Sequence, residues 1–108
     1  MATDATVETF EGLVREGLVL VDLWGPACAP CIALMPLVEE LECRYIGRLQ
    51  LVKVNAPENR QVCRDLRVFG LPTYVLFRDG EEVERLVGDP SIDDIESAIE
   101  IQMESMGR

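Results

Sequence analysis

The chemistry most evident in this chain lies in the motif Cys28-Ala29-Pro30-Cys31, which stands between an apolar strand-like run and a helix-like run. If a helix begins within the motif, Cys28 lies near unpaired backbone N–H groups at the positive end of the helix dipole, which favours a thiolate. Cys31 lies one turn further in, and Pro30 suits a first helical turn because its missing N–H costs nothing there. The spacing predicts a redox dithiol with Cys28 as nucleophile and Cys31 as resolving thiol.

A second candidate is Asp22, a carboxylate inside the apolar run 18–23. A buried carboxylate without a partner is costly unless its pKa rises, and a carboxyl group with a raised pKa can act as a base. The alternative is a structural role in which Lys53 neutralises Asp22, if the strands that carry them are neighbours in the sheet. Both roles can hold together.

Three further residues near or outside the motif leave alternatives open. Trp24 is the single tryptophan and stands four positions before Cys28, so it is either a core aromatic or part of the rim of the site. Cys43 and Cys63 are expected to be one surface thiol and one small buried residue. The alternative is a regulatory thiol or an intermolecular disulfide at Cys43.

Charge and composition exclude several classes of protein. Twenty acidic residues stand against ten basic ones, and the formal net charge of −10 disfavours nucleic acid and anionic lipid as partners. The chain contains no histidine, so a Cys-His or Ser-His catalytic pair and an imidazole metal site are excluded.

Length and the N-terminal sequence give the expected organisation. The 108 residues match the usual size of one domain, so we expect a single domain over residues 1–108. No apolar run approaches the roughly 20 residues of a membrane helix, and the acidic N-terminus lacks the pattern of a signal peptide. We expect a soluble cytoplasmic protein, in which a Cys-x-x-Cys pair is more often catalytic or metal-binding than structural.

The elements that position these residues follow from the spacing of apolar side chains. The predicted order is a helix (about 6–16, ended by Gly17), a strand (18–23), a helix after the motif with Pro36 inside it, a strand (49–54), a short polar helix (57–66), a hairpin (73–77 and 83–87, turning at Asp79-Gly80) and a last helix capped by Ser91. Helices that alternate with buried strands, followed by a hairpin and a closing helix, predict an α/β fold with a central mixed sheet and helices on both faces.

The whole chain resembles the thioredoxin family. The resemblance is carried by Asp22-Leu23-Trp24, Cys28-Ala29-Pro30-Cys31, Pro36, Lys53, Gly70-Leu71-Pro72-Thr73 and Gly88, in that order. It implies a thioredoxin fold and dithiol–disulfide exchange with protein substrates, so we expect a monomeric protein-disulfide reductase that needs no cofactor or metal. It also implies that a flavin-dependent, NADPH-linked thioredoxin reductase recharges the protein.

The same resemblance implies roles for single residues. Asp22 would lie beneath Cys31 and accept its proton, with Lys53 supporting the transfer. Pro72 would be a cis-proline facing the site, which leaves the Leu71 backbone free to pair with an extended substrate segment. The implied substrate-binding residues are Trp24, Ala29, Pro30, Leu71, Pro72 and Gly88.

Three positions depart from the family pattern. Ala27 stands where a tryptophan usually precedes the first cysteine, Ala29 replaces the usual glycine, and Ile32 follows Cys31 where a lysine is common. These changes leave the thiol chemistry intact but alter the surface that partners meet.

The sequence leaves three other functions to consider. A tetrathiolate zinc or iron–sulfur site at Cys28, Cys31, Cys43 and Cys63 needs two Cys-x-x-Cys knuckles, and the chain has one. The presence of both motif cysteines argues against a redox-inert interaction domain. A specialised oxidase or isomerase is the remaining alternative, although such relatives commonly carry a histidine between the cysteines and an export signal.

Overall fold

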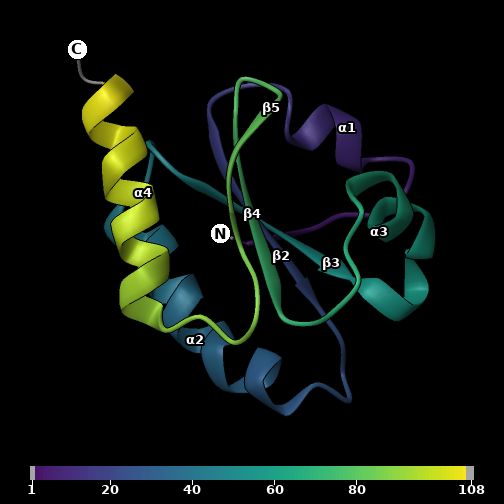
Figure 1. The fold of residues 1–108 in the computed structure, drawn as a ribbon. Coiled ribbons are helices and arrows are strands. Elements are labelled where there is room, and N and C mark those ends of the chain that lie inside the picture. Colours follow the sequence, from purple (N-terminus) through teal and green to yellow (C-terminus); the bar gives the residue numbers. More distant parts are fainter. Residues whose placement is uncertain (1, 107–108) are drawn as a thin grey trace.

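The computed structural model describes residues 2–106, and within them a five-stranded mixed sheet carries helices on both faces, as predicted (Figure 1). The strands are β1 (Thr3–Asp4), β2 (Leu18–Trp24), β3 (Gln50–Asn55), β4 (Thr73–Arg78) and β5 (Glu81–Leu86). Their order is β1-β3-β2-β4-β5, with β1 and β2 parallel to β3, β4 antiparallel to β2, and β5 antiparallel to β4.

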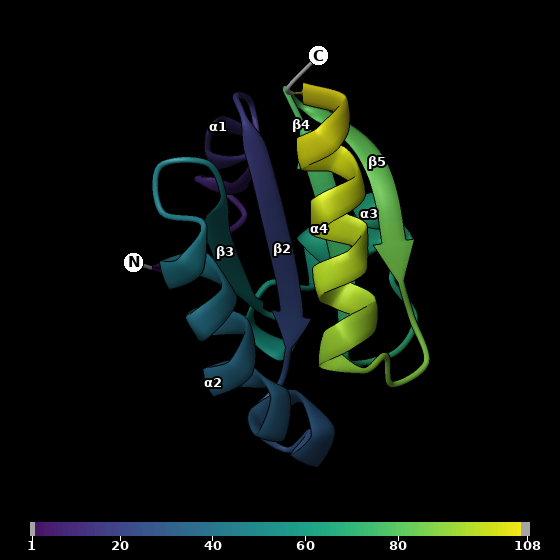
Figure 2. The same ribbon diagram turned by 90° about the vertical axis from the view of Figure 1, so that its left-hand side faces the viewer.

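The helices divide into two pairs on opposite faces of the sheet. They are α1 (Phe10–Leu13), α2 (Ala29–Arg44), α3 (Arg60–Leu66) and α4 (Ile92–Met106), with the short 3-10 helix η1 (Ala56–Glu58) before α3. The helices α2 and α4 cover one face, and α1 and α3 cover the other (Figures 1 and 2). Pro36 lies inside α2, which continues past it to Arg44. No helix among the described residues is both long enough and apolar enough to cross a membrane.

The central strand β2 explains why the sequence shows a continuous apolar run there. Every residue from Leu18 to Leu23 is buried, because side chains on both faces of the strand enter a core. Even-numbered residues of β2 face α2 and α4, in a core rich in leucine and isoleucine. Odd-numbered residues face α1 and α3, in a core built mainly from valines. Asp22 therefore lies on the face that α2 covers.

The first helix is much shorter than predicted. Instead of residues 6–16 it spans only Phe10–Leu13. The Thr9 hydroxyl accepts a hydrogen bond from the Thr6 N–H at 2.9 Å, and such side-chain bonds compete with helical ones. Gly17 ends the segment with φ +74°, as expected of a stop residue.

The two-residue strand β1 was not predicted. It pairs with β3 in parallel, with Thr3 beside Val52 and Asp4 beside Lys53. A strand of this length has no apolar periodicity from which it could be recognised.

Two local signals in the second half of the chain are confirmed. Asp79 and Gly80 both have positive φ, at +51° and +87°, which is the backbone of a tight hairpin turn between β4 and β5. At the start of α4 the Asp94 N–H donates to the Ser91 hydroxyl and the Ser91 N–H donates to the Asp94 carboxylate, both at 3.1 Å. This reciprocal pair is a capping box.

Candidate active site

The two motif cysteines form a disulfide at the start of α2, with their Cα atoms 5.3 Å apart. Cys28 is the residue before the helix and has an extended backbone (φ −95°, ψ 99°), while Pro30 lies in the first turn. The Cys31 N–H donates to the Cys28 sulfur at 3.3 Å, so a free N–H of the helix end points at this sulfur. Cys28 is half-buried and Cys31 is fully buried. The helix therefore begins where the sequence predicted, and the exposure of the two sulfurs differs.

The segment that precedes β4 forms the opposite wall of the site. Leu23 in β2 pairs with Thr73 in β4, so the loop after β2 and the loop before β4 meet at one end of the sheet, the lower end in Figure 1. The Leu71–Pro72 peptide bond is cis, as the resemblance implied. A Cβ atom added at Gly25 would lie 3.2 Å from Leu71 Cδ1, so glycine allows the two walls to approach closely.

Asp22 is fully buried on β2, and neither carboxylate oxygen has a hydrogen-bond partner among the described residues. Burial raises the pKa of Asp22 from 3.8 to about 7, which Lys53 counteracts and Glu39 reinforces. Lys53 does lie beside Asp22 in the adjacent strand β3. Its ammonium, however, makes its ion pair with Glu39, with Nζ 3.2 Å from Oε2. Direct neutralisation of Asp22 by Lys53 is therefore not what the structure shows.

Tyr74 is a neighbour of Asp22 that the sequence analysis missed. It lies opposite Asp22 on β4, is fully buried, and its hydroxyl has no partner among the described residues. Burial and then the nearby Asp22 carboxylate raise the pKa of the Tyr74 phenol, so it stays neutral. The pairing of β2 with β4 brings the two residues together across about fifty positions of sequence, so no local pattern signals it.

The unpartnered polar groups gather at one end of the sheet. In residues 2–106, the buried side-chain oxygen and nitrogen atoms without a hydrogen-bond partner belong to Asp22, Trp24, Asn55 and Tyr74. Trp24 pairs with Asn55 across β2 and β3, at the end from which the chain continues toward the cysteines. Native structures leave few such groups unpaired, so their concentration marks an unusual polar region at the end of the sheet that leads to the cysteine motif.

The remaining residues implied by the resemblance fall into two groups. Leu71, Pro72 and Gly88 line one groove of about 330 Å³. Trp24 is half-buried, and Ala29 and Pro30 are exposed beside Cys28; these three do not line that groove. The departures from the family pattern at Ala27 and Ile32 are also exposed, so they change the surface around the disulfide.

The groove has an apolar rim that the sequence analysis did not single out. Phe69 is 94% exposed and Val87 is 62% exposed, and both line the groove with Leu71. Such exposed apolar groups beside a reactive site suit contact with a partner. The only sequence signal for this rim was Phe69, an apolar residue directly before Gly70 that fits no helix or strand periodicity.

The other two cysteines lie apart from the site and from each other. Cys43 is an exposed, unpaired thiol on α2, and Cys63 is a half-buried, unpaired thiol on α3, where burial raises its pKa. Because α2 and α3 cover opposite faces of the sheet, four cysteines cannot converge on one ion. Among the described residues no cluster of three cysteines or carboxylates is arranged to hold a metal.

Comparison with known proteins agrees with this architecture. The thioredoxin family model matches residues 2–101. The thioredoxin of Bacillus subtilis is 38% identical over 84 residues, which cover 78% of this chain and 81% of the relative. Thioredoxin 1 of a Nostoc species is 40% identical over 86 residues, with coverage of 80% and 79%. The thioredoxin of Staphylococcus saprophyticus is 33% identical over 95 residues, with coverage of 88% and 91%.

A redox-active cysteine pair at a helix start, a mixed sheet covered on both faces and a family match over nearly the whole chain agree with one another. Proteins that contain disulfides are the substrates. The chain belongs to the thioredoxin family and is a thiol–disulfide oxidoreductase of the protein-disulfide reductase type.

Proposed function

We propose that Cys28 attacks the disulfide of a protein substrate and that Cys31 resolves the mixed disulfide. In the first step the Cys28 thiolate bonds to one substrate sulfur, and the substrate S–S bond breaks to release one thiolate. In the second step the Cys31 thiolate bonds to the Cys28 sulfur, and the second substrate thiolate leaves. The dithiol is oxidised to the Cys28–Cys31 disulfide, and the two electrons pass to the substrate.

The observation that carries this assignment is the difference in exposure between the two sulfurs. Cys28 is half-buried at the start of α2, whereas Cys31 is fully buried behind it. A substrate sulfur can approach Cys28 from solvent, and the N–H groups at the helix start favour the Cys28 thiolate.

We propose that Asp22 accepts the Cys31 proton before the second step. A carboxyl group with a pKa of about 7 is about half ionised at neutral pH, so it can take up and return a proton in one cycle. Lys53 would support this transfer, because it lowers the pKa of Asp22 while its own charge is held by Glu39. Without that contribution, burial would keep more of Asp22 protonated and unable to act as a base.

The substrate is proposed to bind as an extended segment across both walls of the site. Leu71 is 36% exposed directly before Pro72, so its backbone is a candidate for pairing with the substrate main chain. The proposed contact surface comprises Trp24, Ala29, Pro30, Leu71, Pro72 and Gly88. Phe69 and Val87 would extend it as apolar contacts.

The setting of the reaction is also part of the proposal. A flavin-dependent, NADPH-linked thioredoxin reductase would return the disulfide to the dithiol, as family membership suggests. Two unpaired thiols, Cys43 and Cys63, suit a reducing compartment such as the cytoplasm. Residues 1–108 would form one domain, which the single sheet shared by both cores supports, and would act as a monomer.

Two measurements test the proposed function. Reduced protein should reduce insulin disulfides catalytically with dithiothreitol as electron donor, and the turbidity of the released B chain reports the rate. Brief alkylation of reduced protein near neutral pH, followed by mass mapping, should label Cys28 well before Cys31 and before Cys63, whose pKa is raised. Failure to reduce insulin, or labelling of Cys43 with Cys28 untouched, would contradict the proposal.

A further inference from the structure

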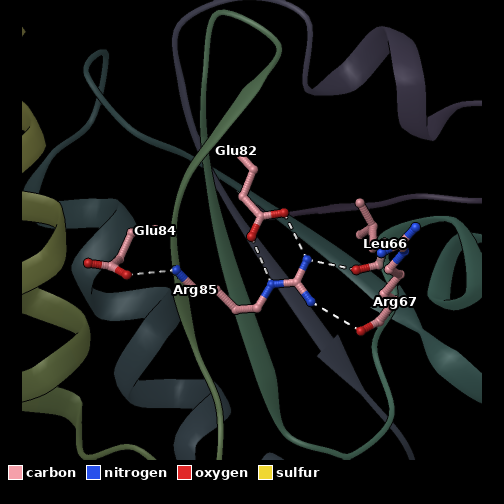
Figure 3. A network of polar contacts seen from close by, with 5 residues as sticks. All are labelled: Leu66, Arg67, Glu82, Glu84 and Arg85. Carbon is pink, nitrogen blue, oxygen red and sulfur yellow. Dashed lines mark hydrogen bonds and ion pairs between the residues drawn. The ribbon is translucent and has the colours of Figure 1, made fainter.

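Arg85 on β5 makes a dense set of polar contacts with the end of α3 (Figure 3). Its guanidinium donates to both carboxylate oxygens of Glu82, each at 2.8 Å. The same group donates to the Leu66 carbonyl at 2.7 Å and to the Arg67 carbonyl at 3.2 Å. The Glu84 carboxylate accepts the Arg85 backbone N–H at 2.9 Å. One side chain on the outer strand thus holds the last carbonyl of α3 and the carbonyl of the residue that follows it.

An irregularity in the sheet allows Glu82 to reach Arg85. Residues three apart on a regular strand point to opposite faces, because side chains alternate. Here Leu76 pairs with Glu84 and Phe77 pairs with Glu82, so Val83 is an extra residue on β5. This bulge brings Glu82 onto the same face as Arg85, the face that α3 covers. Figure 3 shows both side chains pointing toward the end of α3.

The carbonyls that Arg85 holds belong to a strained turn. Arg67 has left-handed backbone angles (φ +57°, ψ +49°), a conformation that glycine usually supplies at the end of a helix. The Val68 N–H donates to the Cys63 carbonyl at 2.8 Å, which closes the turn. The bidentate contact with Glu82 fixes the orientation of the Arg85 guanidinium, and the guanidinium in turn holds the turn in place.

This turn starts the segment 67–71 that leads to Pro72. Its far end is held by the Thr73 hydroxyl, which donates to the Gly70 carbonyl at 2.7 Å. Phe69 lies between the two anchored carbonyls and Leu71 directly follows the second, and the exposed side chains of both line the groove. Anchoring a binding segment at both ends lowers the entropy cost of ordering it on contact with a partner.

We propose that Arg85, fixed by Glu82, is a positioning residue for substrate binding, because it holds the segment 67–71 in the conformation that presents Leu71 beside Pro72. This inference rests on the proposed role of Leu71 and Pro72 in binding the substrate. Arg85 does not touch the reacting sulfurs. It acts on recognition of a protein substrate and leaves the intrinsic chemistry of Cys28 unchanged.

The test compares a protein substrate with a small one. Reduced Arg85→Gln is mixed with increasing insulin under single-turnover conditions, and separately with 5,5′-dithiobis(2-nitrobenzoic acid), which is too small to need the segment. The half-saturating insulin concentration should rise roughly three- to tenfold, while the limiting rate and the rate with the small disulfide stay within about twofold. The Cys28–Cys31 reduction potential should not change. Arg85→Lys keeps the charge but loses the planar guanidinium that makes the bidentate contact. It should raise the half-saturating insulin concentration less than Arg85→Gln does.

A matched control and a second variant sharpen the test. Arg44→Gln removes a different exposed ion pair, with Glu96 on α4, and should leave insulin saturation unchanged. Glu82→Gln removes the carboxylate that fixes Arg85 but leaves the arginine in place, so it should raise the half-saturating concentration less than Arg85→Gln. If Arg85→Gln does not fold, the inference is tested with Glu82→Gln and Arg85→Lys. A higher half-saturating insulin concentration in these variants supports it, and an unchanged concentration in both overturns it.

Leu71→Ser separates this inference from the proposed function. If Leu71→Ser raises the half-saturating insulin concentration and Arg85→Gln does not, the positioning role of Arg85 is wrong and the proposed substrate surface stands. If neither variant raises it, the proposed surface is wrong and the positioning role falls with it. Equal losses with insulin and the small disulfide in Arg85→Gln would mean a general structural role, which also overturns the inference.

Discussion

The two walls of the active site are built in different ways. The wall that carries the disulfide is local: Cys28 precedes α2, Pro30 lies in its first turn and Cys31 follows, all within one short motif. The opposite wall, before β4, is held at its start by Arg85, a residue of another strand, and near its end by the local Thr73 hydroxyl. The first wall contains the two cysteines, and residues of the second wall line the groove. The geometry of the cysteine pair is therefore encoded locally, whereas the shape of the groove depends also on a tertiary contact.

The largest expected effects follow from breaking the first wall. Cys31→Ser cannot resolve a mixed disulfide, so it should accumulate covalent complexes with target proteins, whereas Cys28→Ser should form none. Non-reducing electrophoresis after mixing each variant with a cell lysate measures this directly. Cys43→Ser, which removes the exposed thiol on the same helix, should behave as wild type. Equal trapping by both motif variants would mean that the two roles are misassigned.

Asp22→Asn should lower the rate of the second step. Asparagine has nearly the same shape but cannot accept a proton, so resolution of the mixed disulfide should slow by about tenfold or more at pH 7. The wild-type rate should also rise with pH through about 7, where Asp22 ionises, and the variant should lack this inflection. Stopped-flow measurement of the Trp24 fluorescence over a range of pH gives the rate of the second step and its pH dependence in both proteins. A variant with the wild-type rate and pH profile would reduce Asp22 to a structural residue.

The same substitution should change stability in a pH-dependent way. The pKa of Asp22 is raised from 3.8 to about 7 on folding, so the folded protein binds the proton more tightly and loses stability as pH rises between these values. Above pH 7 this loss is complete and amounts to about 4 kcal/mol, which is the upper limit of what Asp22→Asn can recover. Urea unfolding should show a gain for the variant at pH 8.5 and almost none at pH 4. An equal gain at both pH values would contradict the assignment.

Gly25→Ala tests the place where the two walls meet. The added Cβ would lie 3.2 Å from Leu71 Cδ1, so Leu71 must shift by a few tenths of an ångström. We expect a stability loss of roughly 1 kcal/mol from overpacking and a small rise in the half-saturating insulin concentration. Gly12→Ala is the control, because nothing lies within 4 Å of its Cβ position and alanine favours a helix. A fully neutral Gly25→Ala would show that the walls are less tightly packed than the structure indicates.

The smallest expected effect comes from Phe69→Ala on the second wall. Removing this exposed ring should raise the half-saturating insulin concentration about two- to threefold, since one apolar contact is lost, and should leave the rate with a small disulfide unchanged. Ile46→Ala, which trims another exposed apolar side chain in the turn before β3, is the control. If both variants behave as wild type, Phe69 does not contribute to recognition.

The fold was predictable wherever neighbouring residues decide the backbone. The strand β2, the hairpin turn at Asp79 and Gly80, and the start of α4 at Ser91 all agree with the sequence patterns. The first helix was overestimated because its apolar spacing was helical, while the Thr6 and Thr9 hydrogen bonds favour a turn. The strand β1 was missed because its pairing with β3 is the only thing that makes it a strand.

For the site, the sequence by itself determined the reactive pair, its position at a helix start and the presence of a carboxylate in an apolar strand. Each depends on spacing within a few residues, because helix ends and strand alternation are local properties. Only the tertiary structure decided that Lys53 pairs with Glu39, that Tyr74 lies beside Asp22, and that Arg85 holds the turn at Arg67. These contacts depend on strand order, on a bulge that changes which face a side chain takes, and on burial, which no local pattern specifies.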